Sequence, residues 1–334
     1  MPIRRRHLAH LCSGLAAATV LPAAAQQPAA PATDRHIRLI VPFPAGGATD
    51  AVARLFAPAF SAALAGQQAV IENRTGGGGI PGADHVAKSA PDGLTLLVAT
   101  SSIHSTQPAV NPSGLPFDPE RDFTPLALLG VSPSLLLVSA QVPARTLREF
   151  IAWAKAHPGE VNYGSSGVGT IPHLNAALFD ALAGTSMTHV PYRGTGPVYA
   201  ELRRGEVHAL LDVPSTAAPH LQAGAVRALA HTGAQAETPL APGLPSMEAA
   251  GLPGGLVSET WFGLYGPAGL PAATADRLSK GALIALADPA LRERFLSIGV
   301  EVRAEGSEAL ARVAREERVR WVELIRRHGI RVTE

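Results

Sequence analysis

The sequence predicts an α/β protein with two sheets, and three observations lead to this prediction. Short apolar runs alternate with amphipathic segments from residue 34 onward, which is the rhythm of βαβ units in a mostly parallel sheet. The 334 residues are enough for about two domains. Roughly ten strands are expected, and two sheets of about five strands are commoner than one sheet of ten.

Strands are expected where about four to eight residues rich in Val, Ile, Leu and Thr lie between turn residues. The first run, IRLIVP, is apolar enough to be buried on both faces. The stretches near 124–134 and 256–266 are apolar and bounded by Gly or Pro, so they are candidate crossovers between the sheets. The expected strands are Ile37–Pro42, Gln68–Glu72, Thr95–Thr100, Phe123–Val131, Leu135–Val138, Val161–Gly164, Thr188–Pro191, Val207–Val213, Val226–His231, Thr260–Tyr265 and Val300–Arg303.

Helices are expected where apolar residues recur every three or four positions. The last segment shows this pattern most clearly, with an apolar stripe on one face and charges elsewhere. The expected helices are Thr49–Ala65, Ile80–Ser89, Thr146–His157, Ile171–Gly184, Gly196–Arg204, Ser215–Ala223, Pro271–Leu286, Ala290–Ile298 and Ser307–His328.

The composition excludes several classes of protein. Charged residues make up 16% of the chain, and 28 Lys and Arg nearly balance 27 Asp and Glu, for a formal net charge of +1. No charge cluster resembles a nucleic-acid patch, and near-neutrality argues against a nucleic-acid partner. The low charge and the clear apolar periodicity also exclude a disordered chain.

Residues 1–25 have the features of an export signal that is removed. Three arginines at positions 4–6 precede the apolar stretch Leu8–Val20, and Ala23–Ala25 offers a cleavage site. A membrane anchor is disfavoured because the stretch is shorter than the ~20 residues that a spanning helix needs. A twin-arginine route and an ordinary one are both left open. Residues 26–33, rich in Pro and Ala, are expected to be a flexible tether.

Removal of this leader changes the chemistry of the chain. Three arginines and no acidic residue are lost, so the net charge of +1 becomes −2. Cys12, the only cysteine, is lost as well. A chain without thiols suits an oxidising compartment and excludes a thiol nucleophile, a disulfide and a cysteine-ligated metal. A lipid-modified Cys12 is disfavoured because its neighbours are not the small residues expected there.

The segment Val41–Asp50 (VPFPAGGATD) is the first candidate binding site. A strand leads through a turn with Gly46 and Gly47 into a helix that opens near Thr49 and Asp50, both good N-cap residues. The start of a helix attracts an anion through its free amides and its partial positive charge. A plain turn between strand and helix is the alternative.

A glycine-rich segment is the second candidate. Gly77, Gly79 and Gly82 fit the pattern G-x-G-x-x-G between a strand and a helix, which is typical of dinucleotide sites. However, Pro81 lies within the pattern, and the position about twenty residues on, where an acid should bind the ribose, falls in an apolar strand. A glycine-rich surface loop is therefore favoured.

The third candidate is the Gly/Ser loop in NYGSSGVGTIPHLNAA. Ser165, Ser166 and Thr170 offer hydroxyls beside backbone amides at the predicted start of a helix. A serine hydrolase is disfavoured, because neither serine has glycine at both the second position before it and the second after it.

Asp212 is the fourth candidate. It stands at the end of an apolar strand, and ligands bind at the carboxyl ends of strands in open α/β sheets. A helix cap or a buried hydrogen-bond acceptor is the alternative. The histidines are scattered without H-E-x-x-H or another paired-ligand spacing, so no metal site is predicted.

Taken together, these stretches resemble the substrate-binding proteins of tripartite tricarboxylate transporters, also called the Bug or TctC family. The resemblance covers about residues 38 to 330, and the order and spacing of its motifs make it specific. Ala45 stands where a second Pro is usual, Thr75 where Pro often follows E-N-R, and Val213 where Asn or Pro commonly follows the Asp. The motifs that carry the resemblance are VPFPAGGATD, VIENRTGGGGIPGADHVAKSAPDGLTLL, LPFDPERDFTPLALL, NYGSSGVGT, HVPYRGTGP, LLDVPS, PHLQAGAVRALA, LPSMEAAGLPG and TWFGLYGPAG.

The resemblance implies a periplasmic binding protein-like fold of type II, in which two α/β lobes are joined by two hinge strands around a ligand cleft. Residues 34–130 and 261–334 are expected to form the first lobe and residues 131–260 the second. The implied function is non-enzymatic. In the periplasm, the lobes close on a small carboxylate (a di- or tricarboxylate, an amino acid or an aromatic acid), which is delivered to the permease subunits. No cofactor, metal or nucleic acid is implied, and a monomer is expected.

The resemblance also places the binding loops. Helix N-termini that face each other from two lobes can hold a carboxylate without Lys or Arg, which agrees with a net charge of −2. Some contacts are expected to run through ordered water. If Asp212 reaches the cleft, it should favour an ammonium or hydroxyl donor over a second carboxylate. The expected ligand-binding residues are Phe43, Ala45, Gly46, Gly47, Thr49, Asp50, Ser101, Ser165, Ser166, Gly169, Thr170 and Asp212.

Two other functions are left open. One is an exported ligand sensor that docks on a receptor instead of a permease. The other is an exported α/β enzyme, either a dehydrogenase at Gly77–Gly82 or a hydrolase at Ser165 or Ser166. A bound nicotinamide cofactor, or a base within hydrogen-bond reach of either serine, would favour the enzyme.

Overall fold

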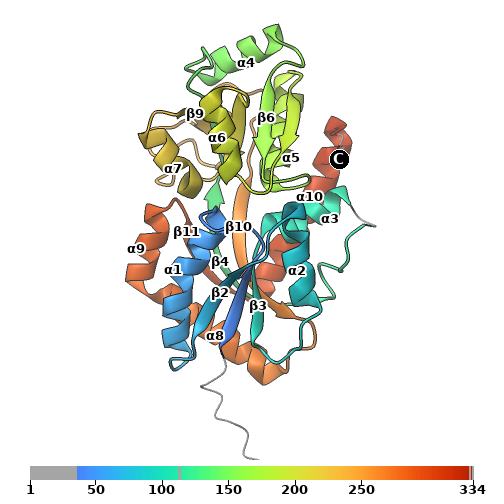
Figure 1. The fold of residues 1–334 in the computed structure, drawn as a ribbon, viewed down its shortest axis with the longest axis vertical. Coiled ribbons are helices and arrows are strands. Elements are labelled where there is room, and N and C mark those ends of the chain that lie inside the picture. The colour runs from blue at the N-terminus through green and yellow to red at the C-terminus, as the bar shows by residue number, and fades with distance from the viewer. Residues whose placement is uncertain (1–35, 112–113, 331, 333–334) are drawn as a thin grey trace, which may run out of the picture. The chain divides into compact units, whose positions relative to one another are not determined.

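Two β-sheets form the frame of the protein (Figure 1). The computed structural model describes residues 36–111, 114–330 and 332, so the predicted signal peptide and tether lie outside the described residues. The six-stranded sheet contains, in spatial order, β11 (Glu301–Gly306), β4 (Phe123–Pro133), β10 (Glu259–Pro267), β3 (Thr95–Thr100), β1 (Ile37–Val41) and β2 (Ala69–Asn73). The five-stranded sheet contains β7 (Thr188–Pro191), β6 (Asn162–Ser165), β8 (Ala209–Asp212), β5 (Leu135–Ser139) and β9 (Val226–His231). We call the six-stranded sheet with its helices the first lobe, and the five-stranded sheet with its helices the second lobe.

Both sheets are mixed, whereas the sequence predicted mostly parallel ones. In the first lobe β1 runs parallel to β2 and β3, but β10 is antiparallel to β3 and β4, and β11 to β4. In the second lobe β6 runs parallel to β7 and β8, but β5 is antiparallel to β8 and β9. The prediction was wrong here because a fully buried strand is apolar in either direction, so its pattern does not record its orientation.

The chain crosses between the lobes at two places, at the strands predicted as crossovers. β4 of the first lobe leads into β5 of the second lobe through a single residue, Ser134, and residues 232–258 lead back from β9 to β10. The two crossings are bonded to each other. The amide of Thr232 donates to the Ser134 carbonyl at 2.9 Å, and the amide of Ser258 donates to the Thr232 carbonyl at 2.9 Å.

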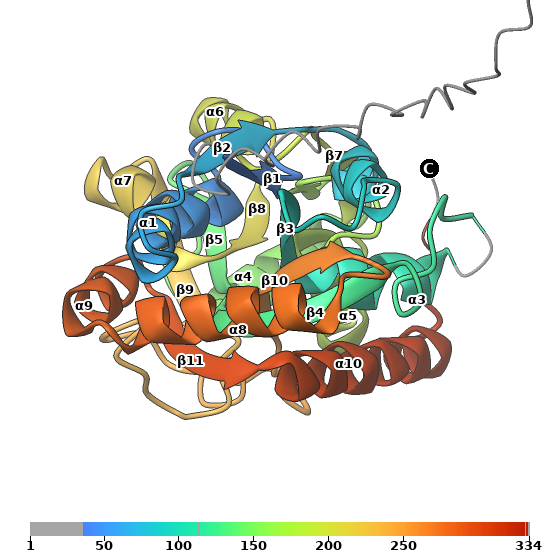
Figure 2. The ribbon, with the colours of Figure 1, turned by 90° about the horizontal axis from the view of Figure 1, so that it is seen from below.

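Helices cover both faces of each sheet (Figure 2). One face of the six-stranded sheet packs against α1 (Ala48–Ala63), α8 (Ala272–Ala287) and α9 (Pro289–Ser297). Its other face packs against α2 (Ile80–Ala87), the π-helix η3 (Ser102–Thr106) and α10 (Ser307–His328), while the short α3 (Gln107–Val110) packs against a core cluster of the second lobe. The five-stranded sheet lies between α4 (Leu147–Ala156) with α5 (Ile171–Ala183), and α6 (Gly196–Arg204) with α7 (Pro214–Gln222). The sequence did not predict the helical stretch 102–110.

Local sequence explains how several helices begin. Thr146 Oγ1 accepts a hydrogen bond from the Glu149 amide at 3.2 Å, and the Glu149 carboxylate accepts one from the Thr146 amide, so α4 opens with a capping box. Three helices of the second lobe instead carry proline in their first turn, at Pro172, Pro197 and Pro214. Proline is tolerated there because its missing N–H has no partner within the helix.

The C-terminal helix α10 contributes to the cores of both lobes. Leu310 and Ala314, in its first half, belong to a core cluster of the first lobe. Trp321, farther along, is fully buried in a core cluster of the second lobe with Leu324 and Ile325 packed beside it. The predicted lobe boundaries assign all of α10 to the first lobe, but its last turns also stabilise the second.

Replacing Trp321 with alanine is expected to lower the free energy of unfolding by about 3–5 kcal/mol, because a large buried aromatic side chain is lost. Val319 lies on the same helix with 63% of its surface exposed, and Val319→Ala should cost less than about 0.5 kcal/mol. Chemical denaturation followed by circular dichroism measures both variants. Equal costs would contradict the role given to Trp321.

Candidate functional site

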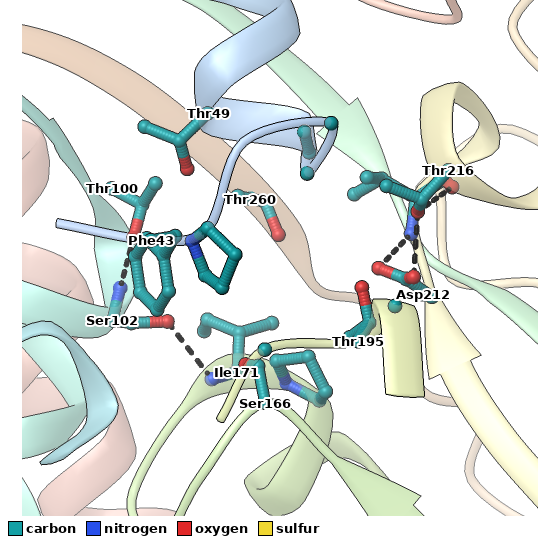
Figure 3. A pocket seen from close by; sticks show the side chains of 18 of the residues that line it. Phe43, Thr49, Thr100, Ser102, Ser166, Ile171, Thr195, Asp212, Thr216 and Thr260 are labelled. Carbon is teal, nitrogen blue, oxygen red and sulfur yellow. Dashed lines mark hydrogen bonds between the residues drawn. The ribbon is translucent and has the colours of Figure 1, made fainter. Parts of the chain in front are cut away.

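A cavity of about 290 Å³ lies between the two lobes (Figure 3). This volume is near the lower end of the ~300–1,000 Å³ that small-molecule sites occupy. The first lobe lines the cavity with the loop from β1 to α1, the end of β3 and the strand β10. The second lobe lines it with the starts of α5, α6 and α7. The site therefore lies at strand-to-helix corners of both lobes.

Contacts between the lobes hold them together around the cavity. Thr106 Oγ1 of the first lobe donates a hydrogen bond to the Gly169 carbonyl of the second at 2.6 Å. In the loop that follows β1, Pro44 packs against Gly194 so closely that a Cβ on Gly194 would lie 2.9 Å from the proline ring. The structure therefore shows the lobes closed over the cavity.

Helix α1 begins at the cavity. Gly47, Ala48 and Thr49 all line it, and the N-cap residue Gly47 provides no side-chain cap. The first amides of an α-helix have no partner within the helix, and this first turn contains no proline. The N-terminus of α1 therefore combines unpaired donors with a partial positive charge, which suits an anion.

Asp50 holds the loop that lines the cavity and does not line the cavity itself. Its carboxylate accepts hydrogen bonds from the Gly46 amide at 2.9 Å, Arg54 Nε at 2.7 Å and Asn73 Nδ2 at 3.0 Å. The same Asn73 nitrogen donates to the Phe43 carbonyl at 3.0 Å. Burial raises the pKa of Asp50, but the hydrogen bonds outweigh burial, so the pKa lies below its ordinary value.

Three helices of the second lobe also begin at the cavity, so four helix N-termini within the described chain meet there. None of the described residues that line the cavity is Lys or Arg. The ionisable side chains in the lining are Tyr199, Asp212 and His220, and burial lowers the pKa of His220, as does the nearby charge of Arg203. An anion in this cavity is therefore held by helix dipoles, amides and hydroxyls.

Asp212 lines the cavity, but its carboxylate is already hydrogen-bonded (Figure 3). Oδ1 accepts from the Val213 amide at 2.9 Å, while Oδ2 accepts from Tyr199 Oη at 3.0 Å and Thr216 Oγ1 at 2.6 Å. The Thr195 side chain is a further donor. Burial raises the pKa of Asp212, and these hydrogen bonds oppose the rise without cancelling it. Asp212 thus fits both readings of the sequence, as a residue at the ligand cavity and as a buried acceptor.

The structure places only some of the predicted binding residues in the lining. Those that line the cavity are Phe43, Ala45, Gly46, Gly47, Thr49, Ser166 and Asp212. Those that lie behind the lining are Asp50, Ser101, Ser165, Gly169 and Thr170. Thr170 Oγ1 donates to the Gly167 carbonyl at 2.7 Å and so shapes its own loop. Ser101 is buried beside Ser102, which does line the cavity and accepts a hydrogen bond from the Ile171 amide at 3.1 Å.

Part of the lining was not predicted from the sequence. The missed polar residues are Thr100, Ser102, Thr195, Tyr199, Thr216, His220 and Thr260. Thr195 could have been found, because it lies between a predicted strand and a predicted helix, as Gly47 does. Thr260 could not, because it lies near the start of a crossover strand and nothing in the pattern indicates which face of that strand looks into the cavity.

Ser165 has a base within hydrogen-bond reach, which is the observation that was to favour a hydrolase. Its Oγ lies 2.7 Å from His189 Nε2. However, Ser165 is fully buried outside the cavity lining, and its Oγ also accepts from the Gly167 amide at 3.2 Å. His189 stacks on His173 with ring centroids 3.7 Å apart, and burial lowers the pKa of His189 to about 4. A weak base on a serine that no substrate reaches supports the loop and does not make a nucleophile.

Within the glycine-rich segment Gly76–Gly79, the second lobe covers Gly78, while Gly77 is exposed. Gly78 and Gly79 have φ angles of 65° and 95°, which favour glycine. A Cβ on Gly78 would lie 2.2 Å from Gln107 Nε2 and 3.2 Å from the Val168 carbonyl oxygen. Gln107 Nε2 itself donates to that carbonyl at 2.7 Å. Gly78 therefore allows the lobes to approach, and its part of the loop backbone is covered.

The described residues contain neither a cluster of metal-ligating side chains nor a helix able to span a membrane. No group of three or more His, Cys, Asp or Glu side chains there is arranged to hold a metal ion. Within the same part of the chain, no helix combines the length and the apolar character needed to cross a bilayer.

Comparison with known proteins gives one family and several close structural neighbours. Residues 52–330 match the family described as "Tripartite tricarboxylate transporter family receptor". The periplasmic binding protein BugD is 30% identical with a TM-score of 0.82, and the alignment covers 89% of this chain and 98% of BugD. Rpa4515 of R. palustris, solved with adipate, is 34% identical with a TM-score of 0.84, over 89% of this chain and 98% of Rpa4515. MatC from Rhodopseudomonas palustris, solved with malate, is 35% identical with a TM-score of 0.81, over 87% of this chain and 99% of MatC. These findings confirm the predicted family and the periplasmic binding protein fold.

Replacing Asp50 with asparagine is expected to lower the free energy of unfolding at pH 7 by ~1–3 kcal/mol, because a buried network loses its charged acceptor. The pKa of Asp50 is lower in the folded chain than its ordinary 3.8, so its stabilising contribution is complete above that value. The contribution is lost as the pH falls through the folded pKa. Denaturation curves at pH 7 and at successively lower pH should show the difference from the wild type shrinking.

Asp276→Asn is the matched control, because Asp276 is exposed on α8. It should leave the free energy of unfolding unchanged within about 0.5 kcal/mol. A deficit for Asp50→Asn that stayed constant down to low pH would contradict the assigned role of its charge.

Proposed function

Because this chain belongs to the tripartite tricarboxylate transporter receptor family, we propose that it is an exported, periplasmic solute-binding protein that captures a small carboxylate and delivers it to the permease of such a transporter. The observation that carries this proposal is the cavity between the lobes, where helix N-termini converge and no Lys or Arg is among the described lining residues. Two relatives were solved with adipate and with malate, which are small carboxylates.

The carboxylate binds at the N-terminus of α1. The amides of Ala48 and Thr49 donate to its oxygens, and the Thr49 hydroxyl lies in the same lining. From the other lobe, Ser166 and the start of α5 complete the shell. A hydrogen bond to a charged group contributes ~1.5–3 kcal/mol, so a few such bonds suffice for capture and still permit release.

Closure follows from the division of these donors between the lobes. A ligand that contacts both lobes binds the closed arrangement better than the open one, and this difference in affinity is what shifts the population toward closure. The ligand-loaded, closed form is the form that a permease would recognise. The protein acts as a monomer, without cofactor, metal or catalytic residue.

Replacing Ala48 with proline removes one donor at the proposed carboxylate site. Ala48 is the first residue of α1, where proline is tolerated, and the preceding Gly47 has the extended conformation (φ −76°, ψ 169°) that proline requires of its neighbour. The wild type is first titrated with a panel of C4–C6 mono-, hydroxy- and dicarboxylates. The variant is expected to bind the acid that the wild type binds most tightly about 10- to 100-fold more weakly than the wild type does. Isothermal titration calorimetry measures the change.

Ser307→Pro is the control, because Ser307 is likewise the first residue of its helix and follows a glycine in an extended conformation (Gly306, φ −76°, ψ −171°). Its affinity for the same ligand should equal that of the wild type, since the described residues that line the cavity do not include the start of α10. Equal affinities of Ala48→Pro and wild type would contradict an anion site at α1. Absence of binding to every acid in the panel would contradict the proposed function.

Deletion of the gene is expected to abolish uptake of the radiolabelled acid that binds most tightly, and the wild-type gene should restore it. Complementation with the Ala48→Pro variant should restore uptake only at ligand concentrations about 10- to 100-fold higher, because capture limits transport. Uptake that persists in the deletion strain, with loss of a transcriptional response to the acid, would instead identify a ligand sensor.

A further inference from the structure

The two ends of the cavity differ in the direction of their hydrogen bonds. At the α1 end the protein offers donors, namely the amides at the start of the helix. At the other end lies the carboxylate of Asp212, only 5% exposed and bordered by Thr195, Tyr199 and Thr216. A molecule that spans the cavity therefore meets different chemistry at each end.

The hydroxyl hydrogens around Asp212 are already used within the protein. Tyr199 Oη and Thr216 Oγ1 both donate to Oδ2, at 3.0 Å and 2.6 Å. The other acceptor within reach of Thr216 Oγ1, the Val213 carbonyl at 3.1 Å, also belongs to the protein. Each hydroxyl carries one hydrogen and two lone pairs, so a hydroxyl that donates to Asp212 can only accept from a ligand. The Thr195 hydroxyl is committed in the same way.

Few backbone donors are left at this end. The Val213 amide donates to Asp212 Oδ1 at 2.9 Å, and Pro214, the first residue of α7, has no N–H. At the start of α6, Pro197 lacks an N–H too, so among the lining residues at this corner the amides of Thr195 and Gly196 are left. A second carboxylate at this corner would therefore meet two amides, but it would also meet the Asp212 carboxylate and hydroxyl oxygens that can only accept.

The charge of Asp212 also disfavours a second carboxylate at this end of the cavity. An ionised Asp212 repels a second carboxylate, and the repulsion is stronger inside a protein than in water because the surroundings screen it less. None of the described lining residues is a Lys or Arg that could offset it. His220, which stacks on Tyr199 with ring centroids 3.9 Å apart, is kept neutral by burial and by Arg203, as its lowered pKa indicates.

We propose that this cavity selects acids that carry one carboxylate and, at the opposite end, a hydroxyl or ammonium group, and that it discriminates against dicarboxylates of the same length. The inference rests on the proposed function and narrows its ligand class. The carboxylate lies at α1, and the donor group of the ligand points at the oxygens of Thr195, Tyr199, Thr216 and Asp212. The preference differs from that suggested by the relatives solved with adipate and malate.

Calorimetric titration of the mature chain at pH 7.5 tests the proposal with acids matched in length. The pairs are 4-hydroxybutyrate and succinate, 5-hydroxypentanoate and glutarate, and 6-hydroxyhexanoate and adipate. The ω-amino acid of each length separates the ammonium donor from the hydroxyl donor. At the best-fitting length, the hydroxy or amino acid is expected to bind at least 10-fold more tightly than the dicarboxylate.

A dicarboxylate that binds as tightly as the best hydroxy or amino acid would overturn this inference and leave the proposed function intact. Failure of all the acids to bind would overturn both. For each length, the affinity ratio is the affinity for the hydroxy or amino acid divided by that for the dicarboxylate. Asp212→Asn is expected to reduce this ratio at least 10-fold, because it removes the charge and frees hydroxyl hydrogens to turn toward the cavity.

Asp180→Asn is the matched control for the Asp212 variant. Asp180 is a partly buried carboxylate of the second lobe that bonds Thr185 and the Met187 amide and is not among the described residues lining the cavity. Its replacement should leave the affinity ratio unchanged. If thermal melting shows that Asp212→Asn folds poorly, the wild-type affinities alone test the proposal, because it requires the affinity ratio at the best-fitting length to be at least 10.

Discussion

The proposed capture of a carboxylate depends on the cost of taking that group out of water without a cation to receive it. An ionised group that leaves water must be compensated by hydrogen bonds or charge. Here the described cavity lining contains neither Lys nor Arg, so compensation must come from backbone amides, with help from hydroxyls. Amides become available in numbers only where helices begin, and an α/β lobe places these starts at the carboxyl ends of its strands. The two-lobed fold brings such corners together from opposite sides.

A site built from backbone depends on side chains that never reach the ligand. The loop before α1 keeps its shape because Asp50 and Asn73 bond the Gly46 amide and the Phe43 carbonyl. In the second lobe the loop after β6 is fixed by Thr170 and by the contact between Ser165 and His189. These polar groups share features with catalytic residues, because they make short hydrogen bonds in buried or half-buried places and the pKa values of Asp50 and His189 are lowered. Their geometry shows that they position the backbone.

The sequence predicted the two-sheet fold, most helix boundaries and the β1–α1 corner, because these features depend on local patterns. The Gly46-Gly47 turn, for example, carries its own signal. Contacts between distant segments left no such signal in the sequence. Ser102 lines the cavity and its neighbour Ser101 does not, because the helical stretch after β3 starts with a π-helix, which the pattern did not indicate. The four donors around Asp212 come from two separate corners, the starts of α6 and α7, so no single spacing in the chain could have shown that this carboxylate was already bonded.

Helix α10 limits the way in which the lobes can part. Leu310 packs in a core cluster of the first lobe, and Trp321 packs in a core cluster of the second lobe. Pulling the lobes straight apart would expose an indole that now has no contact with solvent, at a cost of ~2–3 kcal/mol for that side chain alone. An opening rotation that leaves Trp321 buried avoids this cost, so α10 favours rotation of the lobes over their straight separation.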